Sequence, residues 1–185
     1  MKIEETFMVA APQDRVWRFI TDPEEVGPCL PGCQGIEITG DNTYRAAIKV
    51  ALGPIKTTFN VDIELTEEEP PRFAASVTRG EEGGRASQVS AQSVLRLNAL
   101  NESETEVFYS SDVSVVGRLG KFGLGIMQKK AKSMGADFAL AFRERVEKAA
   151  EEATIETLES VVPAPLRLSW WARLLAFFGL GRRLA

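Results

Sequence analysis

The chain has 185 residues, of which 44% are apolar, and a formal net charge of −4. This length fits one domain of ordinary size with an appendage, and the apolar fraction is sufficient for a packed core. There is no histidine, so the usual general base and the commonest metal ligand are absent.

Charge is unevenly distributed along the chain. The last 21 residues contain four arginines and no acid, which leaves about −8 for residues 1–164. An acidic body argues against a nucleic-acid partner, because phosphate binding needs a basic face. The acidic N-terminus does not resemble a secretory signal. We therefore expect a cytoplasmic protein whose thiols are reduced.

The N-terminal region predicts a strand followed by a helix. Residues 2–9 form a short strand pattern, and Pro12 occupies a helix-start position. Val16, Trp17, Phe19 and Ile20 then give an apolar helical face, which ends at Pro23.

Two cysteines lie in a Pro- and Gly-rich bend that follows this helix. Cys29 and Cys33 have the spacing C-x-x-x-C, which is not the C-x-x-C redox motif. A zinc site needs four ligands, and the chain has no second cysteine pair. The spacing favours a structural role and no metal site, with metal or redox chemistry as the alternative.

Residues 35–115 change to a period of two, which is typical of strands with one buried face. Short loops rich in Gly, Pro and Asn separate the strands and favour an antiparallel meander. The positions expected to face inward are Tyr44, Ala46, Ile48 and Val50; Phe59, Val61, Ile63 and Leu65; Phe73, Ala75 and Val77; and Val107, Tyr109, Ser111, Val113 and Val115.

The strand over residues 86–97 carries unusually small residues on its apolar face. Ser87, Ala91 and Ser93 share that face with Val89 and Leu95. Small inward residues leave room for a cavity, although a tightly curved sheet packed closely on a helix would also explain them.

A long helix is predicted from about residue 120 to 152, with a glycine-rich entry where a lid could move. Met127, Ala131, Met134, Phe138 and Phe142 form one stripe, and Phe122 lies towards a second face. The stripe suits either plain core or an adaptable cavity wall. Strand, helix, a sheet of six to seven antiparallel strands and a long C-terminal helix predict an α+β helix-grip fold, in which the curved sheet wraps around the helix.

We expect three regions: a ligand-binding domain over 1–150, an acidic and Pro-containing linker over 151–165, and an amphipathic basic helix over 166–185. The uncharged run in the last region is too short to span a bilayer, but paired Trp and Phe with flanking Arg favour binding at an anionic membrane surface. A helix docked on its own domain or on a partner is the alternative. The expected membrane-binding residues are Trp170, Trp171, Arg173, Leu174, Leu175, Phe177, Phe178, Arg182 and Arg183.

Several motifs in residues 1–148 resemble the family of the carbon monoxide dehydrogenase G subunit, within the START-like (SRPBCC) superfamily. They are VAAPQDRVW at 9–17, DPEEVGPCLPGC at 22–33, YRAAIKVALGPIKTTF at 44–59 and GRLGKFG at 117–123. The resemblance implies a non-catalytic accessory protein of molybdenum-containing hydroxylases such as carbon monoxide dehydrogenase. It also implies membrane recruitment of that enzyme and a quinone carried in an apolar cavity, and it assigns both cysteines to the bend.

The leading hypothesis is a quinone carrier attached peripherally to the cytoplasmic face of the inner membrane, with menaquinone or ubiquinone as its ligand. The alternatives are a pure membrane-recruitment adaptor and an enzyme like a polyketide cyclase. The residues expected to line the cavity are Tyr44, Ile48, Phe59, Val61, Phe73, Val89, Ala91, Tyr109, Val113, Phe122, Met127, Met134 and Phe138.

Overall fold

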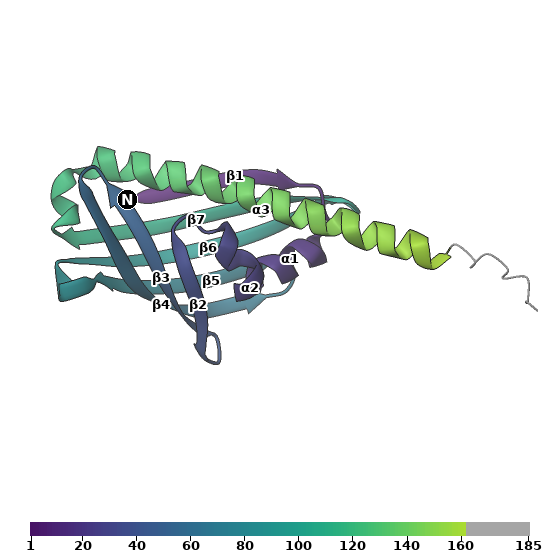
Figure 1. Ribbon diagram of the computed structural model, residues 1–185, viewed down its shortest axis with the longest axis horizontal. Coiled ribbons are helices and arrows are strands. Elements are labelled where there is room, and N and C mark those ends of the chain that lie inside the picture. The colour runs from purple at the N-terminus through teal and green to yellow at the C-terminus, as the bar shows by residue number, and fades with distance from the viewer. Residues whose placement is uncertain (162–185) are drawn as a thin grey trace, which may run out of the picture. The chain divides into compact units, whose positions relative to one another are not determined.

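A seven-stranded antiparallel sheet forms the body of residues 1–150, in the order β1-β7-β6-β5-β4-β3-β2 (Figure 1). The computed structural model describes the backbone of residues 1–161 and the side chains of residues 1–150. The strands are β1 (Lys2–Val9), β2 (Cys33–Gly40), β3 (Thr43–Leu52), β4 (Ile55–Glu69), β5 (Phe73–Glu82), β6 (Ser87–Asn101) and β7 (Glu104–Gly117). The predicted antiparallel meander is confirmed: β2 to β7 are sequential neighbours, and β1 pairs with β7.

The strands β1 and β2 lie at opposite edges of the sheet, and two short helices connect them. Helix α1 (Gln13–Thr21) follows Pro12, and α2 (Pro23–Val26) begins where the Asp22 carboxylate accepts a hydrogen bond of 2.9 Å from the Glu24 amide. A 3₁₀ turn, η1 (Gly27–Cys29), then leads into β2. Two further 3₁₀ turns are η2 (Gly83–Arg85) and η3 (Leu119–Phe122).

Helix α3 (Leu124–Val161) is the long C-terminal helix. It continues past the predicted end near residue 152, so residues 151–161 of the expected linker are helical. The chain divides into two compact units, Met1–Ala150 and Glu151–Ala185. The predicted membrane-binding helix at 166–185 lies outside the described residues.

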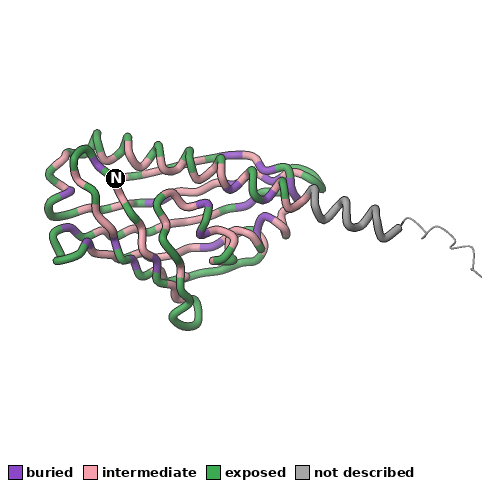
Figure 2. Tube along the Cα trace, viewed as in Figure 1, coloured by how far each residue is buried: buried purple, intermediate pink, exposed green. Residues whose placement is uncertain are grey.

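Two separate apolar clusters stabilise the first unit. One contains Phe7, Trp17, Val107 and Phe142, with Phe138 packed against it. Phe7 meets the rings of Phe138 and Phe142 edge-on at centroid distances of 6.3 and 6.2 Å. The other cluster contains Ala46, Leu52, Phe59, Val61 and Leu119. Figure 2 shows that long stretches of the strands are only partly buried.

Candidate ligand-binding cavity

A cavity of about 610 Å³ lies between the sheet and α3. All seven strands contribute to its wall, together with α1, α2, the bend after η1, η3 and α3. Most of the lining side chains are aliphatic or aromatic. Volumes of this size and mostly apolar walls are typical of small-molecule sites.

Small side chains on the inward face of the central strands create this space. Ala74, Ser76 and Thr78 of β5 face inward, and Ala91 and Ser93 of β6 lie beside them. Ala91 and Ser93, whose small side chains were expected to leave space for a cavity, therefore border one. Ser87 has a different role: it is buried, and its hydroxyl accepts a hydrogen bond of 3.1 Å from the Leu119 amide.

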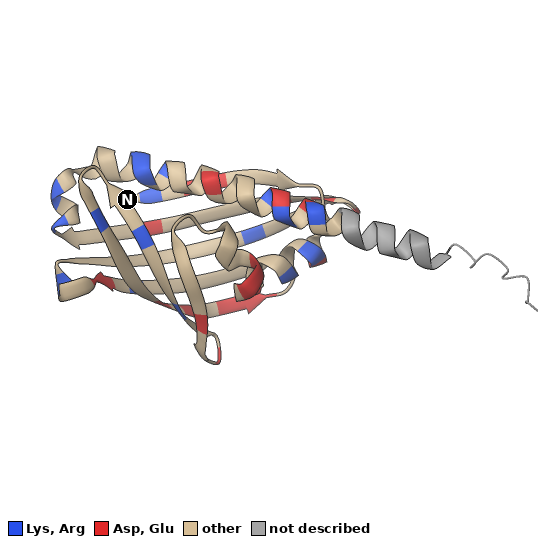
Figure 3. Ribbon diagram, in the orientation of Figure 1, with Lys and Arg blue, Asp and Glu red and all other residues tan. Residues whose placement is uncertain are grey.

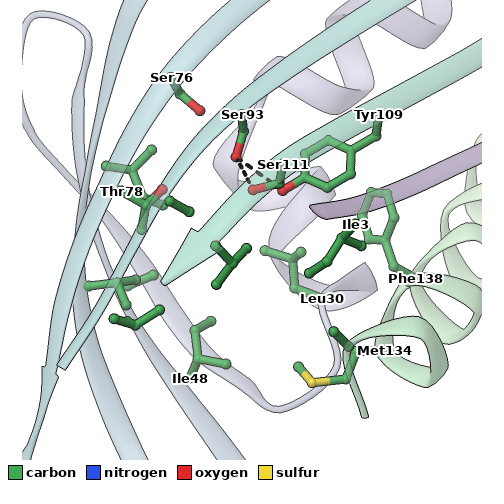
Figure 4. A pocket seen from close by; sticks show the side chains of 18 of the residues that line it. Ile3, Leu30, Ile48, Ser76, Thr78, Ser93, Tyr109, Ser111, Met134 and Phe138 are labelled. Atoms are coloured by element: carbon green, nitrogen blue, oxygen red, sulfur yellow. Dashed lines mark hydrogen bonds between the residues drawn. The ribbon is translucent and has the colours of Figure 1, made fainter. Parts of the chain in front are cut away.

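A row of hydroxyl groups crosses the middle of the cavity floor (Figure 4). Ser76, Ser93 and Ser111 lie directly opposite one another on β5, β6 and β7. The Ser93 hydroxyl is 2.9 Å from the Ser111 hydroxyl and 3.2 Å from the Tyr109 hydroxyl. We call Ser76, Ser93, Ser111 and Tyr109 the hydroxyl row. It supplies both donors and acceptors in mainly apolar surroundings, so it can hydrogen-bond a carbonyl or hydroxyl group of a ligand.

Two charged side chains also line the cavity. Glu5 lies opposite Tyr109 on β1, and Lys130 lies on α3. Both are half-buried. Gly135 permits α3 to approach β1 at this point, because a Cβ there would lie 2.9 Å from the Glu5 side chain.

The cysteine-containing bend forms one wall of the cavity. Leu30 and Pro31 line the cavity, while Gly32 adopts φ +80° and its carbonyl accepts a 2.8 Å hydrogen bond from the Lys49 amide. A Cβ at Gly32 would lie 2.1 Å from the Lys49 carbonyl oxygen, so only glycine fits. The bend is thereby fastened to β3 with its two apolar residues against the cavity.

The cysteines flank this bend without forming a bond. Cys29 is buried and donates a weak hydrogen bond to the Glu25 carbonyl, and burial raises the pKa of its thiol. A raised pKa disfavours the reactive thiolate. Among the residues whose side chains are described, no three Cys, Asp or Glu side chains are grouped so as to hold a metal ion. The structural role of the cysteines stays a prediction.

A buried carboxylate anchors the backbone at the η3 end of the cavity. Glu82 is 3% exposed and bonds to the Arg118 guanidinium, while Leu119, which follows Arg118, lines the cavity. A hydrogen bond from Ser87 and the neighbouring Arg118 lower the pKa of Glu82, against the opposing effect of burial. These contacts hold η3 against the ends of β5 and β6.

The structure brings together most of the residues predicted to line the cavity. Those that do so are Tyr44, Ile48, Phe59, Val61, Val89, Ala91, Tyr109, Val113, Met127, Met134 and Phe138. That they bind a ligand stays a prediction.

Two of the residues predicted for the cavity do not line it in the structure. Phe73 points away from it, because Ala74, Ser76 and Thr78 form the inward face of β5. The Arg96 guanidinium lies over the ring of Phe73, with its Cζ atom 5.7 Å from the ring centroid. Phe122 packs against the second apolar cluster, with its ring near Gly53, and is not among the residues that line the cavity.

Several lining residues were missed by sequence reasoning. They include Ile3, Leu30, Ile36, Ser76, Thr78 and Lys130. The Leu-Pro-Gly sequence at 30–32 marked the bend but not its contact with the cavity. On β5, both faces carry apolar or small residues, so alternation alone did not identify the inward one.

A curved antiparallel sheet around a long helix, with an apolar cavity between them, defines the helix-grip, START-like class of proteins. Within this class, residues 6–147 match the family described as the G subunit of carbon monoxide dehydrogenase (CoxG). The chain therefore belongs to that family, whose members are accessory subunits associated with carbon monoxide dehydrogenase.

Solved structures share the fold at low sequence identity. A conserved protein from Geobacillus kaustophilus is 23% identical with a TM-score of 0.75, over 80% of this chain and 97% of that chain. A START superfamily protein from Mycobacterium smegmatis is 15% identical with a TM-score of 0.64, over 80% and 98%. The ZhuI aromatase/cyclase from Streptomyces sp. R1128 is 21% identical with a TM-score of 0.54, over 83% and 95%. No curated protein matches the chain.

Proposed function

We propose that this protein carries a quinone between the membrane and a molybdenum-containing hydroxylase such as carbon monoxide dehydrogenase. The observation that carries the proposal is a mainly apolar cavity of about 610 Å³ with the hydroxyl row across its floor. A quinone has the matching chemistry: two carbonyl acceptors on a flat ring and a long hydrocarbon tail.

The hydroxyl row would bind the ring, and the apolar walls would bind the tail. Ser93 bonds to both Ser111 and Tyr109. Rotation of any of these hydroxyls lets one donate to a ligand carbonyl without leaving a buried polar atom unpaired. Each methylene of the tail that leaves water contributes roughly 0.8 kcal/mol. Menaquinone and ubiquinone both fit this description.

The C-terminal sequence supports attachment to the inner leaflet of the cytoplasmic membrane. Residues 166–185 combine paired Trp and Phe with four arginines, a composition suited to an anionic interface. Among the described residues, no helix is long and apolar enough to cross a bilayer. The proposed attachment is peripheral and rests on the sequence of the tail, whose uncharged run is too short to span a bilayer.

Quinone extraction from the purified full-length protein tests the proposal. We expect the wild type to retain a quinone identifiable by mass spectrometry, and Met134→Trp to lose it because the added ring occupies the cavity. The matched control is Leu140→Trp, on the exposed outer side of the same helix, which should retain the quinone. In a fully packed site, Met134→Trp would instead cost ~1–3 kcal/mol of stability.

Two results would contradict the carrier function. One is a wild-type protein that neither retains a quinone nor takes one up when it is supplied. The other is Met134→Trp with full quinone content and reduced stability. An empty cavity combined with intact binding to the hydroxylase and to membranes would indicate an adaptor.

A further inference from the structure

The segment over residues 118–132 exposes aliphatic side chains among basic ones. Leu124 and Ile126 are 55% and 53% exposed at the start of α3. Arg118, Lys121, Lys129, Lys130 and Lys132 carry five positive charges. No acidic residue occurs from 113 to 136.

This local charge opposes that of the rest of the chain. Residues 1–164 carry about −8 in total, so the segment is a basic site on an acidic body. Figure 3 shows blue segments on η3 and on the first turns of α3. Arg118 is bound to Glu82, which leaves lysines as the main outward charge.

The segment is also part of the cavity wall. Leu119 and Met127 face the cavity, and Lys130 borders it. Leu124 and Ile126 lie on the solvent side of the same short stretch. A single layer of chain therefore separates the ligand space from whatever this surface contacts.

An anionic bilayer fits the chemistry of this surface better than a protein partner does. Lysine is depleted in protein–protein interfaces. Aliphatic side chains flanked by lysines are instead typical of segments that lie in the headgroup region of anionic lipids. Each lysine near such a surface contributes attraction that amounts to about fivefold in affinity.

We propose that residues 118–132 form the surface that docks the cavity on an anionic bilayer during ligand exchange. The proposal rests on the proposed carrier function, since it names the face through which the ligand enters. The tail would hold the protein near the membrane, and this surface would orient the cavity wall against it. Loss of the surface should therefore slow ligand uptake without detaching the protein.

The test uses full-length protein and vesicles of phosphatidylcholine and phosphatidylglycerol loaded with menaquinone. The variants are Leu124→Ser with Ile126→Ser, and Lys121→Gln with Lys129→Gln; none of these residues lines the cavity. The control is Leu140→Ser, which is 56% exposed and lies about 21 Å farther along the helix than Ile126. The measurement is the rate at which the protein acquires quinone.

Both double variants should load more slowly than the wild type. For Lys121→Gln with Lys129→Gln, the expected decrease is about fivefold for each lysine neutralised. Leu140→Ser should load at the wild-type rate. All variants should float with the vesicles and should take up menaquinone from detergent micelles as the wild type does. The lysine effect should vanish on vesicles of phosphatidylcholine alone.

Four outcomes would overturn the docking surface. Equal loading rates in variants and wild type would do so, as would slower uptake from micelles, which would mean a damaged cavity. Normal loading with slower electron delivery from the hydroxylase would assign the surface to that enzyme. If the wild type takes up quinone from neither source, the carrier function itself is wrong, and the docking surface with it.

Discussion

Glu82 is a buried charged residue whose contacts hold part of the backbone in place. Its carboxylate is buried, yet its pKa is lowered because Ser87 and Arg118 both stabilise the charged form. Through Arg118 and the Ser87–Leu119 hydrogen bond it holds η3, whose Leu119 lines the cavity. A single carboxylate therefore fixes the backbone at one end of the ligand space.

The lowered pKa of Glu82 predicts a loss of stability in acid. A carboxylate whose folded pKa is below its ordinary value of 4.5 stabilises the fold above that pH, and this contribution is lost as the pH falls through the folded pKa. Glu82→Gln should therefore be less stable than wild type at pH 7, and the difference should shrink below about pH 4.5. Urea midpoints between pH 7 and pH 3 measure this.

The exposed Glu68 provides a matched control for this experiment. Glu68→Gln should change stability at pH 7 by no more than ~0.5 kcal/mol, as is usual for surface positions. A Glu82→Gln variant as stable as the wild type at pH 7 would show that the ion pair does not hold η3.

Helix α3 has two different contact surfaces along one stripe. Phe142 is fully buried and stacks on Phe138 with ring centroids 5.5 Å apart, whereas Met127 and Met134 border the cavity. One part of the helix is therefore packed core, and the part before it is a cavity wall. This resolves the two interpretations of the stripe, since each applies to a different part.

The division predicts unequal costs for truncating two large side chains of the same helix. Phe142→Ala should destabilise the protein by ~3–5 kcal/mol, because it opens a void in packed core. Met134→Ala should cost less than ~2 kcal/mol, because its side chain already borders open space and the change only enlarges it. Denaturant unfolding of the ligand-free variants measures both. Similar losses would mean that Met134 is packed as tightly as Phe142.

At the level of elements, the sequence predicts the sheet and the long helix well, because their periodicities differ clearly. Strands with alternating apolar residues, such as the one containing Tyr44 and Ile48, have an unambiguous inward face. Residues 73–78 do not: Phe73 and Val77 alternate with Ala74, Ser76 and Thr78, and the smaller set faces inward. On β5, the cavity therefore reverses the usual expectation that the larger apolar side chains face inward.

The rest of the site depends on contacts between distant segments. Leu30 reaches the cavity because the bend is fastened to β3 through Gly32 and Lys49. Glu5 and Tyr109 become neighbours only when β1 pairs with β7. Local sequence patterns carry no information on such pairings. The sequence places Ser93, Ser111 and Tyr109 individually on inward faces, but it does not predict that they form the hydroxyl row.

For the whole molecule, the basic tail and the acidic body predict separable functions. Deletion of residues 163–185 should abolish flotation with anionic vesicles and leave the thermal midpoint of unfolding nearly unchanged, because the core clusters lie within residues 1–150. Vesicle flotation and thermal unfolding of the two proteins check this. Flotation of the shortened protein at the wild-type level would show that the tail is not the anchor.

The central position of the hydroxyl row has a consequence for the lifetime of a reduced ligand. A quinol held there would lie between the sheet and α3, which would limit the access of dissolved dioxygen to its ring. Under the proposed function, the extent of that shielding would set how long the carrier retains its electrons. The cavity would then protect the ligand from autoxidation in transit as well as keeping it in solution.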